Sequence, residues 1–297
     1  MTDAPLRVGI IGLGVMGMRH ATALASMDGL EFVGAADHGA PRRAMGRPVV
    51  ATLDELLAVG IDACVVATPA SNHWRTAIAL AEASIPTLVE KPLAMGPGQC
   101  AEIEAAFTRA GTVAAVGHVE RFHPAVRELR AALAGGELGP VVNISTRREG
   151  GPPRRRDGGL LLDLGTHDFD LTKWLTGLTY EVVATHSTDA ATTADVVEVA
   201  EVAEVVATLA DGARATHRFS WRATKRVRVI EVRCAGGVLV ADTAVPGADP
   251  PVGLQLSAFH DMVRGRLDPT DARACASLSD GAYAVGVAAR AARAMAG

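Results

Sequence analysis

The sequence predicts two domains: an α/β domain with a doubly wound parallel sheet over residues 1–118, then a strand-rich α+β domain over residues 119–297. In the first part, short apolar runs alternate with helical segments, which is typical of a parallel sheet covered by helices. A glycine-rich motif lies between the first apolar run and the first helix. After residue 118 the alternation stops and strand-like segments dominate.

Length and composition are compatible with this division. A chain of 297 residues is long enough for two cores, and 49% of its residues are hydrophobic while only 4% are aromatic. We therefore expect cores of aliphatic layers rather than aromatic clusters. The net charge of −4 argues against a nucleic-acid-binding surface. The four cysteines are far apart, so neither a metal site nor a disulfide framework is indicated.

The chain starts without the basic and then apolar order of a signal peptide. No uninterrupted apolar run approaches the roughly 18 residues that span a bilayer. We expect a cytoplasmic protein that binds neither membranes nor nucleic acid.

The strand predicted over residues 6–11 runs directly into Gly12-Leu13-Gly14-Val15-Met16-Gly17, and a helix is predicted from Met18 to Met27. This is the G-x-G-x-x-G fingerprint in the strand–turn–helix context that dinucleotide binding requires. Gly12 would permit the tight turn, Gly14 the approach of a pyrophosphate, and Gly17 close packing of helix on strand. The sequence thus predicts a Rossmann domain.

The second strand, Leu30 to Ala36, ends at Asp37, which lies 20 residues after Gly17. A carboxylate near this spacing typically binds the adenosine ribose hydroxyls and repels a 2′-phosphate, which favours NAD. Arg42 and Arg43 would attract that phosphate, so NADP stays an alternative. Asp37 could instead cap a following helix.

Further strands are predicted over residues 62–67, 87–90 and 112–117, with helices over 54–59 and 74–83. The segment from Thr68 to His73 interrupts this pattern where a parallel strand presents its carboxyl end to a ligand. Glu90-Lys91-Pro92 follows the 87–90 strand in the same way, so Lys91 would point toward the ligand crevice. The alternative for Lys91 is an exposed charge at a strand end.

The second part begins with a helix over 125–134 and a strand over 141–146. An Asp-Gly pair within residues 207–216 indicates a hairpin, and the ambiguous stretch 195–206 is assigned to a strand beside it. Strands over 227–234 and 238–241 follow, then helices over 254–264 and 278–295.

Five arginines fall within ten residues, at positions 147, 148, 154, 155 and 156, in what is predicted to be a loop. Guanidinium groups form bidentate hydrogen bonds with phosphates and carboxylates, so these residues suggest a phosphate-bearing substrate. The alternatives are a solvated basic loop or a salt-bridged subunit contact.

The segment from Gly158 to Asp170 places Asp163 and His167 four residues apart. If Asp163 begins a helix, both side chains share one face. An imidazole beside a carboxylate is a common proton acceptor near neutral pH, although such pairs also occur on solvated helices.

These motifs, in this order, resemble the glucose–fructose oxidoreductase, inositol 2-dehydrogenase and MocA (Gfo/Idh/MocA) family over essentially the whole chain. The features that carry this resemblance are the glycine fingerprint, Glu-Lys-Pro at 90–92, Gly-x-x-x-Arg-Phe at 117–122, and GG-x-x-x-D-x-G-x-H-D-x-D at 158–170. The segments 118–124 and 146–156 look most like the nucleotide-sugar 3-dehydrogenase branch. Two departures are the short stretch between Ala241 and Leu254, and His123 where Asn or Asp is more usual.

The resemblance implies an open, mainly antiparallel sheet in the second domain, a homodimer or homotetramer, and a cis Lys91–Pro92 bond. It also implies an NAD(P)-dependent dehydrogenase of a sugar, sugar nucleotide or cyclitol, with Lys91, Asp163 and His167 as the catalytic set. His167 would act as the base and Lys91 would stabilise the substrate oxygen. A keto-sugar or imine reductase and a non-catalytic NAD- or sugar-sensing regulator are the alternatives.

The expected cofactor-binding residues are Gly12, Gly14, Val15, Met16, Gly17, Asp37, His38, Arg42, Thr68, Pro69, Asn72, His73, Glu90 and Lys91. The expected substrate-binding residues are Lys91, His118, Arg121, Arg148, Arg154, Asp163 and His167.

Overall fold

The computed structural model describes residues 4–39, 42–151, 158–187, 192–193, 196–197, 200–245 and 250–296. The chain forms two compact units, Met1–Val119 with Asp249–Ala282, and Glu120–Ala248 with Tyr283–Gly297. The boundary between residues 119 and 120 lies one residue after the expected one. Residues 249–282 belong to the first unit, although they were expected in the second. Within the described residues, no helix is both long and apolar enough to cross a membrane.

The first unit is built on a seven-stranded sheet in the order β3-β4-β2-β1-β5-β6-β7. Its pairings are parallel except for the short β3–β4 hairpin. The strands are β1 (Leu6–Ile11), β2 (Leu30–Ala36), β3 (Arg43–Ala44), β4 (Arg47–Val50), β5 (Ala63–Val66), β6 (Thr87–Glu90) and β7 (Ala114–Gly117). Strands β5 and β6 are buried throughout, as expected when helices cover both faces of a sheet.

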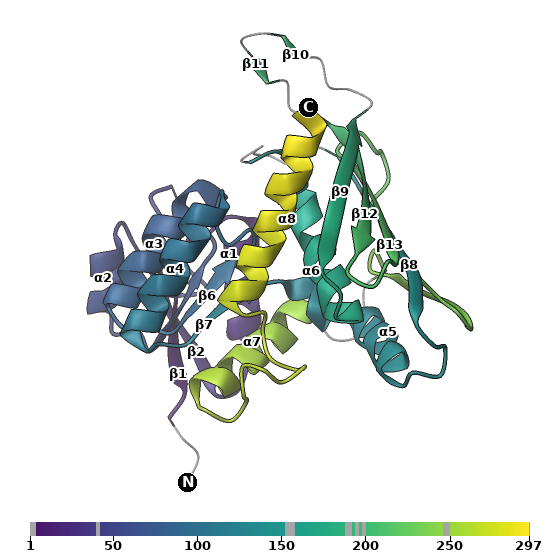
Figure 1. Cartoon of the computed structure of the whole chain (residues 1–297). Helices are drawn as coiled ribbons and strands as arrows, with labels where there is room; N and C mark the ends of the chain where they lie inside the picture. Colours follow the sequence, from purple (N-terminus) through teal and green to yellow (C-terminus); the bar gives the residue numbers. More distant parts are fainter. Residues whose placement is uncertain are drawn as a thin grey trace. The chain divides into compact units, whose positions relative to one another are not determined.

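Among the described residues, the helices that lie wholly in the first unit are α1 (Val15–Leu24), α2 (Leu53–Ala58), α3 (Ala70–Glu82), α4 (Pro97–Ala110) and α7 (Pro251–Val263). Figure 1 shows α2, α3 and α4 along one face of the sheet, while α1 packs with α7 on the other. Two local signals explain their ends. Thr52 and Glu55 form a capping box at α2, and Gly111 ends α4 in the left-handed conformation.

The order of the strands places a switch point between β1 and β5. The chain moves from β1 toward β2 and β4, then returns to the other side of β1 for β5, β6 and β7. In open α/β sheets, ligands bind beyond the carboxyl ends of the strands at such a point. The doubly wound sheet predicted from the sequence is confirmed.

The second unit is built on a six-stranded sheet in the order β15-β14-β8-β13-β12-β9, in which only β8 and β13 are parallel. The strands are β8 (Val141–Glu149), β9 (Tyr180–Ser187), β12 (Val202–Leu209), β13 (Arg214–Ser220), β14 (Val227–Cys234) and β15 (Gly237–Asp242). A separate pair, β10 (Thr192–Thr193) and β11 (Val196–Val197), is antiparallel. The Asp-Gly hairpin is confirmed, because β12 and β13 are joined by a turn in which Asp211 accepts a hydrogen bond from the amide of Ala213.

Helix α5 (Pro124–Ala134) and helix α6 (Thr166–Thr176) belong to this unit, and α8 (Leu278–Ala296) contributes most of its length. Figure 1 shows α6 and α8 against one face of the sheet. The burial of β12 alternates accordingly, with Ala203, Val205, Ala207 and Leu209 buried and the residues between them partly exposed.

The expectation of purely aliphatic cores is wrong for the second unit. Phe169 of α6 packs edge-on against Tyr180, His217 and Phe219, with ring centroids 5.7, 5.5 and 5.8 Å away. Three of the chain's eleven Phe, Tyr and Trp residues therefore meet where the sheet supports α6. Such edge-to-face pairs add stability beyond the apolar area that they bury.

Most element boundaries differ from the expected ones by one to four residues, and helix α4 and strand β9 were not predicted. Helix α1 begins at Val15 and α3 at Ala70, both earlier than predicted. Strand β8 continues to Glu149, three residues beyond the predicted end, and so includes Arg147 and Arg148.

Candidate active site

The glycine fingerprint forms the turn from β1 into α1. Gly12 has φ +91°, and a Cβ there would lie 2.7 Å from the carbonyl of Ala67. A Cβ at Gly17 would lie 1.9 Å from the Gly12 oxygen, whereas a Cβ at Gly14 would meet nothing within 4 Å. Gly12 and Gly17 thus serve the fold, and Gly14 leaves the backbone open to a ligand.

The first turn of α1 is suited to an anion. Its N-cap is Gly14, and no side chain caps the helix, so the amides of Val15 and Met16 are not covered by a capping group. Amides at a helix N-terminus, together with the helix dipole, bind phosphate. The residues present therefore fit the pyrophosphate of a dinucleotide.

Asp37 lies half-buried at the end of β2, beside the fingerprint. Its Oδ2 accepts a hydrogen bond from the amide of Leu13 at 2.7 Å, and its Oδ1 accepts one from Gly39 at 2.8 Å. The helix-capping alternative does not apply, because the next helix is capped by Thr52. His38 and Arg42 are exposed near this carboxylate in the sequence.

The loop after β5 holds Thr68 and Pro69, and α3 then carries exposed Asn72 and buried His73. The His73 ring lies between two carbonyl oxygens, with Nδ1 2.7 Å from Pro92 and Nε2 3.0 Å from Thr68. Burial lowers the pKa of His73. Its side chain, which is expected to bind cofactor, connects the loop after β5 to the residue after Lys91.

Lys91 follows the carboxyl end of β6 and is half-buried. The Lys91–Pro92 bond is cis, as the family resemblance implies. Glu90, also expected to bind cofactor, turns its side chain into the unit, where Oε1 lies 2.7 Å from Nε2 of His20. Sequence reasoning did not single out His20, because its partner lies 70 residues away.

In the second unit, Asp163 and His167 lie at the start of α6. Residues Leu161–Gly165 form a π-helical turn, so Asp163 is inside this turn and does not begin the helix. The two residues are nevertheless about one turn apart and both are half-buried. The indole Nε1 of Trp221 donates a hydrogen bond to Oδ2 of Asp163 at 3.3 Å. Isolated π-turns within helices frequently occur at functional sites.

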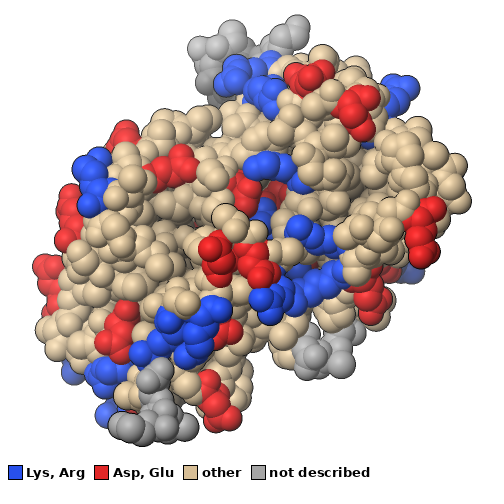
Figure 2. Space-filling model, turned by 60° about the horizontal axis from the view of Figure 1, so that its bottom comes forward, with Lys and Arg blue, Asp and Glu red and all other residues tan. Residues whose placement is uncertain are grey.

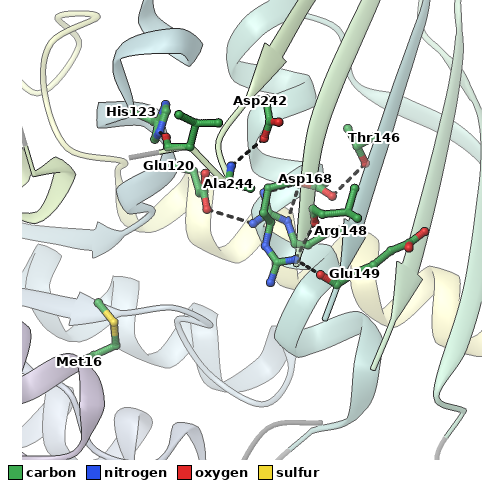
Figure 3. Close-up of polar contacts among 12 residues, drawn as sticks. Met16, Glu120, His123, Thr146, Arg148, Glu149, Asp168, Asp242 and Ala244 are labelled. Atoms are coloured by element: carbon green, nitrogen blue, oxygen red, sulfur yellow. Dashed lines mark hydrogen bonds and ion pairs between the residues drawn. The ribbon is translucent and has the colours of Figure 1, made fainter. Parts of the chain in front are cut away.

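The predicted loop placement of the arginines is wrong for Arg147 and Arg148. Both belong to strand β8. The Arg148 side chain is 3% exposed and binds Asp168 through Nη2 at 2.7 Å and Glu120 through Nη1 at 3.0 Å, as Figure 3 shows. Burial disfavours its charge, but Asp168 and Glu120 outweigh that effect and raise the pKa of Arg148.

Arg147 is exposed and bonds to Glu149 of the same strand at 3.1 Å. Arg154, Arg155 and Arg156 lie outside the described residues.

Arg121 and His118 are buried as well. Arg121 forms a two-pronged ion pair with Asp170 of α6, at 2.8 and 2.5 Å. His118 is 2% exposed at the end of β7. The Arg121 guanidinium, which is expected to bind substrate, connects α6 to the segment before α5.

Asp168 is held by a directional chain of hydrogen bonds. The Thr146 hydroxyl donates to Asp168 Oδ2 at 2.9 Å and lies 2.8 Å from Nδ1 of His217, whose Nε2 lies 2.6 Å from the Tyr180 hydroxyl. Burial lowers the pKa of His217 to about 4, so the ring is neutral. Because Thr146 donates to Asp168, it accepts from Nδ1–H, and Tyr180 donates to Nε2.

No group of three or more potential metal ligands comes together among the described residues. On the face drawn in Figure 2, basic and acidic side chains are interspersed. All four cysteines are buried, and none of them forms a disulfide.

Comparison with known families identifies the two parts of the chain. Residues 6–118 match the model of an oxidoreductase family with an NAD-binding Rossmann fold, and residues 126–240 match the GFO/IDH/MocA C-terminal domain. The chain belongs to the Gfo/Idh/MocA family. The resemblance noted in the motifs is confirmed, as is a first unit of the NAD-binding Rossmann type.

Two curated relatives within this family are similar over part of the chain. One is an inositol 2-dehydrogenase of Saccharopolyspora erythraea, 33% identical over 188 residues, covering 60% of this chain and 56% of the relative. The other is a UDP-N-acetylglucosamine 3-dehydrogenase of Acidithiobacillus ferrooxidans, 32% identical over 177 residues, covering 58% and 55%. The chain thus matches little more than half the length of these relatives.

Among solved structures, GenD2 from gentamicin A biosynthesis, in complex with NAD, superposes with a TM-score of 0.86. It is 25% identical, and the match covers 100% of this chain and 95% of that one.

Proposed function

We propose that this protein is an NAD-dependent dehydrogenase that oxidises a secondary alcohol of a sugar, sugar nucleotide or cyclitol. The nicotinamide, when bound, accepts or returns the hydride. The observation that carries the proposal is the presence of Lys91, Asp163 and His167 in the family's motifs. All three are half-buried; Lys91 follows the end of strand β6, and Asp163 and His167 lie at the start of helix α6. The inositol 2-dehydrogenase and the UDP-N-acetylglucosamine 3-dehydrogenase to which the chain is similar act on substrates of this class.

In this proposal, His167 removes the proton from the substrate hydroxyl. Lys91 stabilises the same oxygen as negative charge develops on it, and Asp163 orients the imidazole or a neighbouring hydroxyl. A positioned acid or base typically contributes about 10²- to 10⁴-fold to rate. A cation placed on the developing oxyanion contributes a comparable or larger factor, on the order of 10²- to 10³-fold.

Within the part of the chain that the structure describes, the arginines do not favour a phosphate-bearing substrate over a neutral one. Arg148 is neutralised by buried carboxylates, which removes one of the five cations proposed to bind phosphate. Arg121, also expected to bind substrate, is neutralised by Asp170. We therefore propose free polyols as the first substrates to test, with sugar nucleotides next.

The test is a panel of free sugars, cyclitols, sugar phosphates and sugar nucleotides, each with NAD⁺ and with NADP⁺, followed by the absorbance of reduced nicotinamide. Reduction of NAD⁺ by a polyol or sugar nucleotide supports the proposal. Tight cofactor binding without turnover of any member would favour the sensing regulator, and turnover only of keto-sugars or imines would favour the reductase. We also propose that the protein is cytoplasmic and forms a homodimer or homotetramer. Size-exclusion chromatography with light scattering measures the molar mass of the assembly and so tests the oligomeric state.

A further inference from the structure

A buried pair of a histidine and a carboxylate lies next to Lys91 in the first unit. Nε2 of His20, on α1, lies 2.7 Å from Oε1 of Glu90, with the two side chains 0% and 5% exposed. Glu90 is the last residue of β6 and precedes Lys91 in the chain. None of the steps proposed for catalysis uses either residue.

The carboxylate of Glu90 is charged in this position. Burial opposes ionisation, but the hydrogen bond and charge of His20 and the charge of Lys91 outweigh it and lower the pKa of Glu90. A carboxylate only accepts hydrogen bonds, so Nε2 of His20 is the donor. Burying such a charge is costly unless it is paired, and a well-packed apolar pair is often equally stable. Stability alone therefore gives little reason for this pair.

The second oxygen of Glu90 points back to the lysine. The amide of Lys91 donates to Oε2 at 3.2 Å. Gly117, at the end of neighbouring β7, leaves room for the carboxylate, because a Cβ there would lie 2.9 Å from both Cα and Cδ of Glu90 and 3.0 Å from Oε2. Elements α1, β6 and β7 thus enclose one carboxylate whose two oxygens reach His20 and Lys91.

We infer that His20 and Glu90 are positioning residues that hold the backbone of Lys91 and place a fixed negative charge beside it. The role of Lys91 itself rests on the proposed function. Because His20 lies on the helix whose N-terminus fits the dinucleotide phosphates, the pair also couples that helix to Lys91. His73, on α3, holds the next carbonyl from the other side, at Pro92.

The sequence makes a direct measurement possible, because its three lysines are Lys91, Lys173 and Lys225. Protein labelled with ¹⁵N-lysine gives three backbone amide signals, of which that of Lys91 is assigned by its loss in Lys91→Arg. The chemical shift and hydrogen exchange of this amide report its bond to Glu90 without cofactor or substrate. The other two amides are internal controls.

Three variants separate positioning from stability. His20→Leu removes the donor, His20→Gln keeps a donor near the place of Nε2, and His20→Leu with Glu90→Leu removes the whole pair without leaving an unpaired charge. We expect exchange of the Lys91 amide to be at least about 10-fold faster in the first and third variants, and within about 3-fold of wild type in the second. The double variant should regain the melting temperature lost in the single leucine variant.

A fourth variant keeps every charge. Gly117→Ala should displace the Glu90 carboxylate and accelerate exchange of the Lys91 amide as much as His20→Leu does. Gly98→Ala is the control, because a Cβ there meets nothing within 4 Å, and it should leave the exchange rate unchanged. With an active substrate, kcat should fall at least about 10-fold in the leucine and Gly117 variants, with the Kd for NAD⁺ little changed.

Two results would overturn the inference. One is a hydrogen-exchange rate of the Lys91 amide that is the same in the double variant as in wild type. The other is recovery of both kcat and melting temperature in the double variant, which would make the pair purely structural. If wild type oxidises no member of the substrate panel, the proposed function fails, while the amide measurements still decide the positioning role.

Discussion

The indole of Trp221 holds the carboxylate of Asp163 through a hydrogen bond of 3.3 Å from Nε1 to Oδ2. Trp221 follows strand β13 and is 2% exposed, whereas Asp163 lies in the π-helical turn before α6. The sheet of the second unit therefore orients a carboxylate that we assign to the catalytic set.

Replacement of this donor should reduce turnover. Trp221→Phe keeps an aromatic ring but leaves Asp163 without the indole N–H, and we expect kcat to fall about 10-fold with a smaller change in KM. Trp74→Phe is the matched control, because its indole donates to Glu102 on the surface. Equal losses of kcat in both variants would remove the positioning role of Trp221.

The buried His217 predicts a pH dependence of stability. Its pKa falls from 6.5 to about 4 in the folded protein, so the unfolded chain binds the proton more readily between these values. The contribution of neutral His217 is thus fully present above the unfolded pKa and is lost as the pH falls toward 4.

Urea titrations should show this loss. Between about pH 7.5 and about pH 5, this group alone should lower the free energy of unfolding by about 2 kcal/mol. His217→Gln should flatten that part of the profile, while replacement of exposed His186 should not. An unchanged slope in the His217 variant would contradict a neutral, buried imidazole.

Arg148 should matter for stability rather than for phosphate recognition. Arg148→Met leaves Asp168 and Glu120 buried without their cation, which typically costs about 3–5 kcal/mol. Arg147→Met removes a side chain that is 58% exposed, and should cost less than about 1 kcal/mol. A variant at Arg148 with normal stability but a raised KM only for phosphorylated substrates would restore the phosphate interpretation.

Asp37 should determine the preference for NAD over NADP. Asp37→Asn removes the negative charge that repels a 2′-phosphate, so the ratio of Kd for NADP⁺ to Kd for NAD⁺ should fall about 10-fold. Titration of protein fluorescence with each cofactor measures both constants. A preference for NADP⁺ in wild type would show that Arg42 and Arg43, rather than Asp37, determine the choice.

Local patterns predicted the first unit well. The strands at Leu30–Ala36 and Thr87–Glu90 begin and end as expected, because each is an apolar run bounded by polar or turn-forming residues. The fingerprint was recognisable because Gly12 and Gly17 are required by contacts within a few residues or with the adjacent strand.

The details of the second unit depend on distant partners. Strand β8 continues through Arg148 because the charge of that residue is neutralised by Asp168, 20 residues later, and a run of arginines by itself suggests a loop. The π-helical turn at Asp163 and the bond from Trp221, 58 residues away, have no local signal either. The same holds for the pairing of His20 with Glu90.

The central claim is that Lys91 acts on the reacting oxygen, and Lys91→Ala tests it most directly. With a substrate found in the panel, kcat and the Kd for NAD⁺ are measured for wild type and variant. We predict that kcat falls by about 10²-fold or more while the Kd for NAD⁺ stays within about 3-fold of wild type. Retention of kcat would contradict the claim, and an equal loss of cofactor binding would indicate a disrupted site instead.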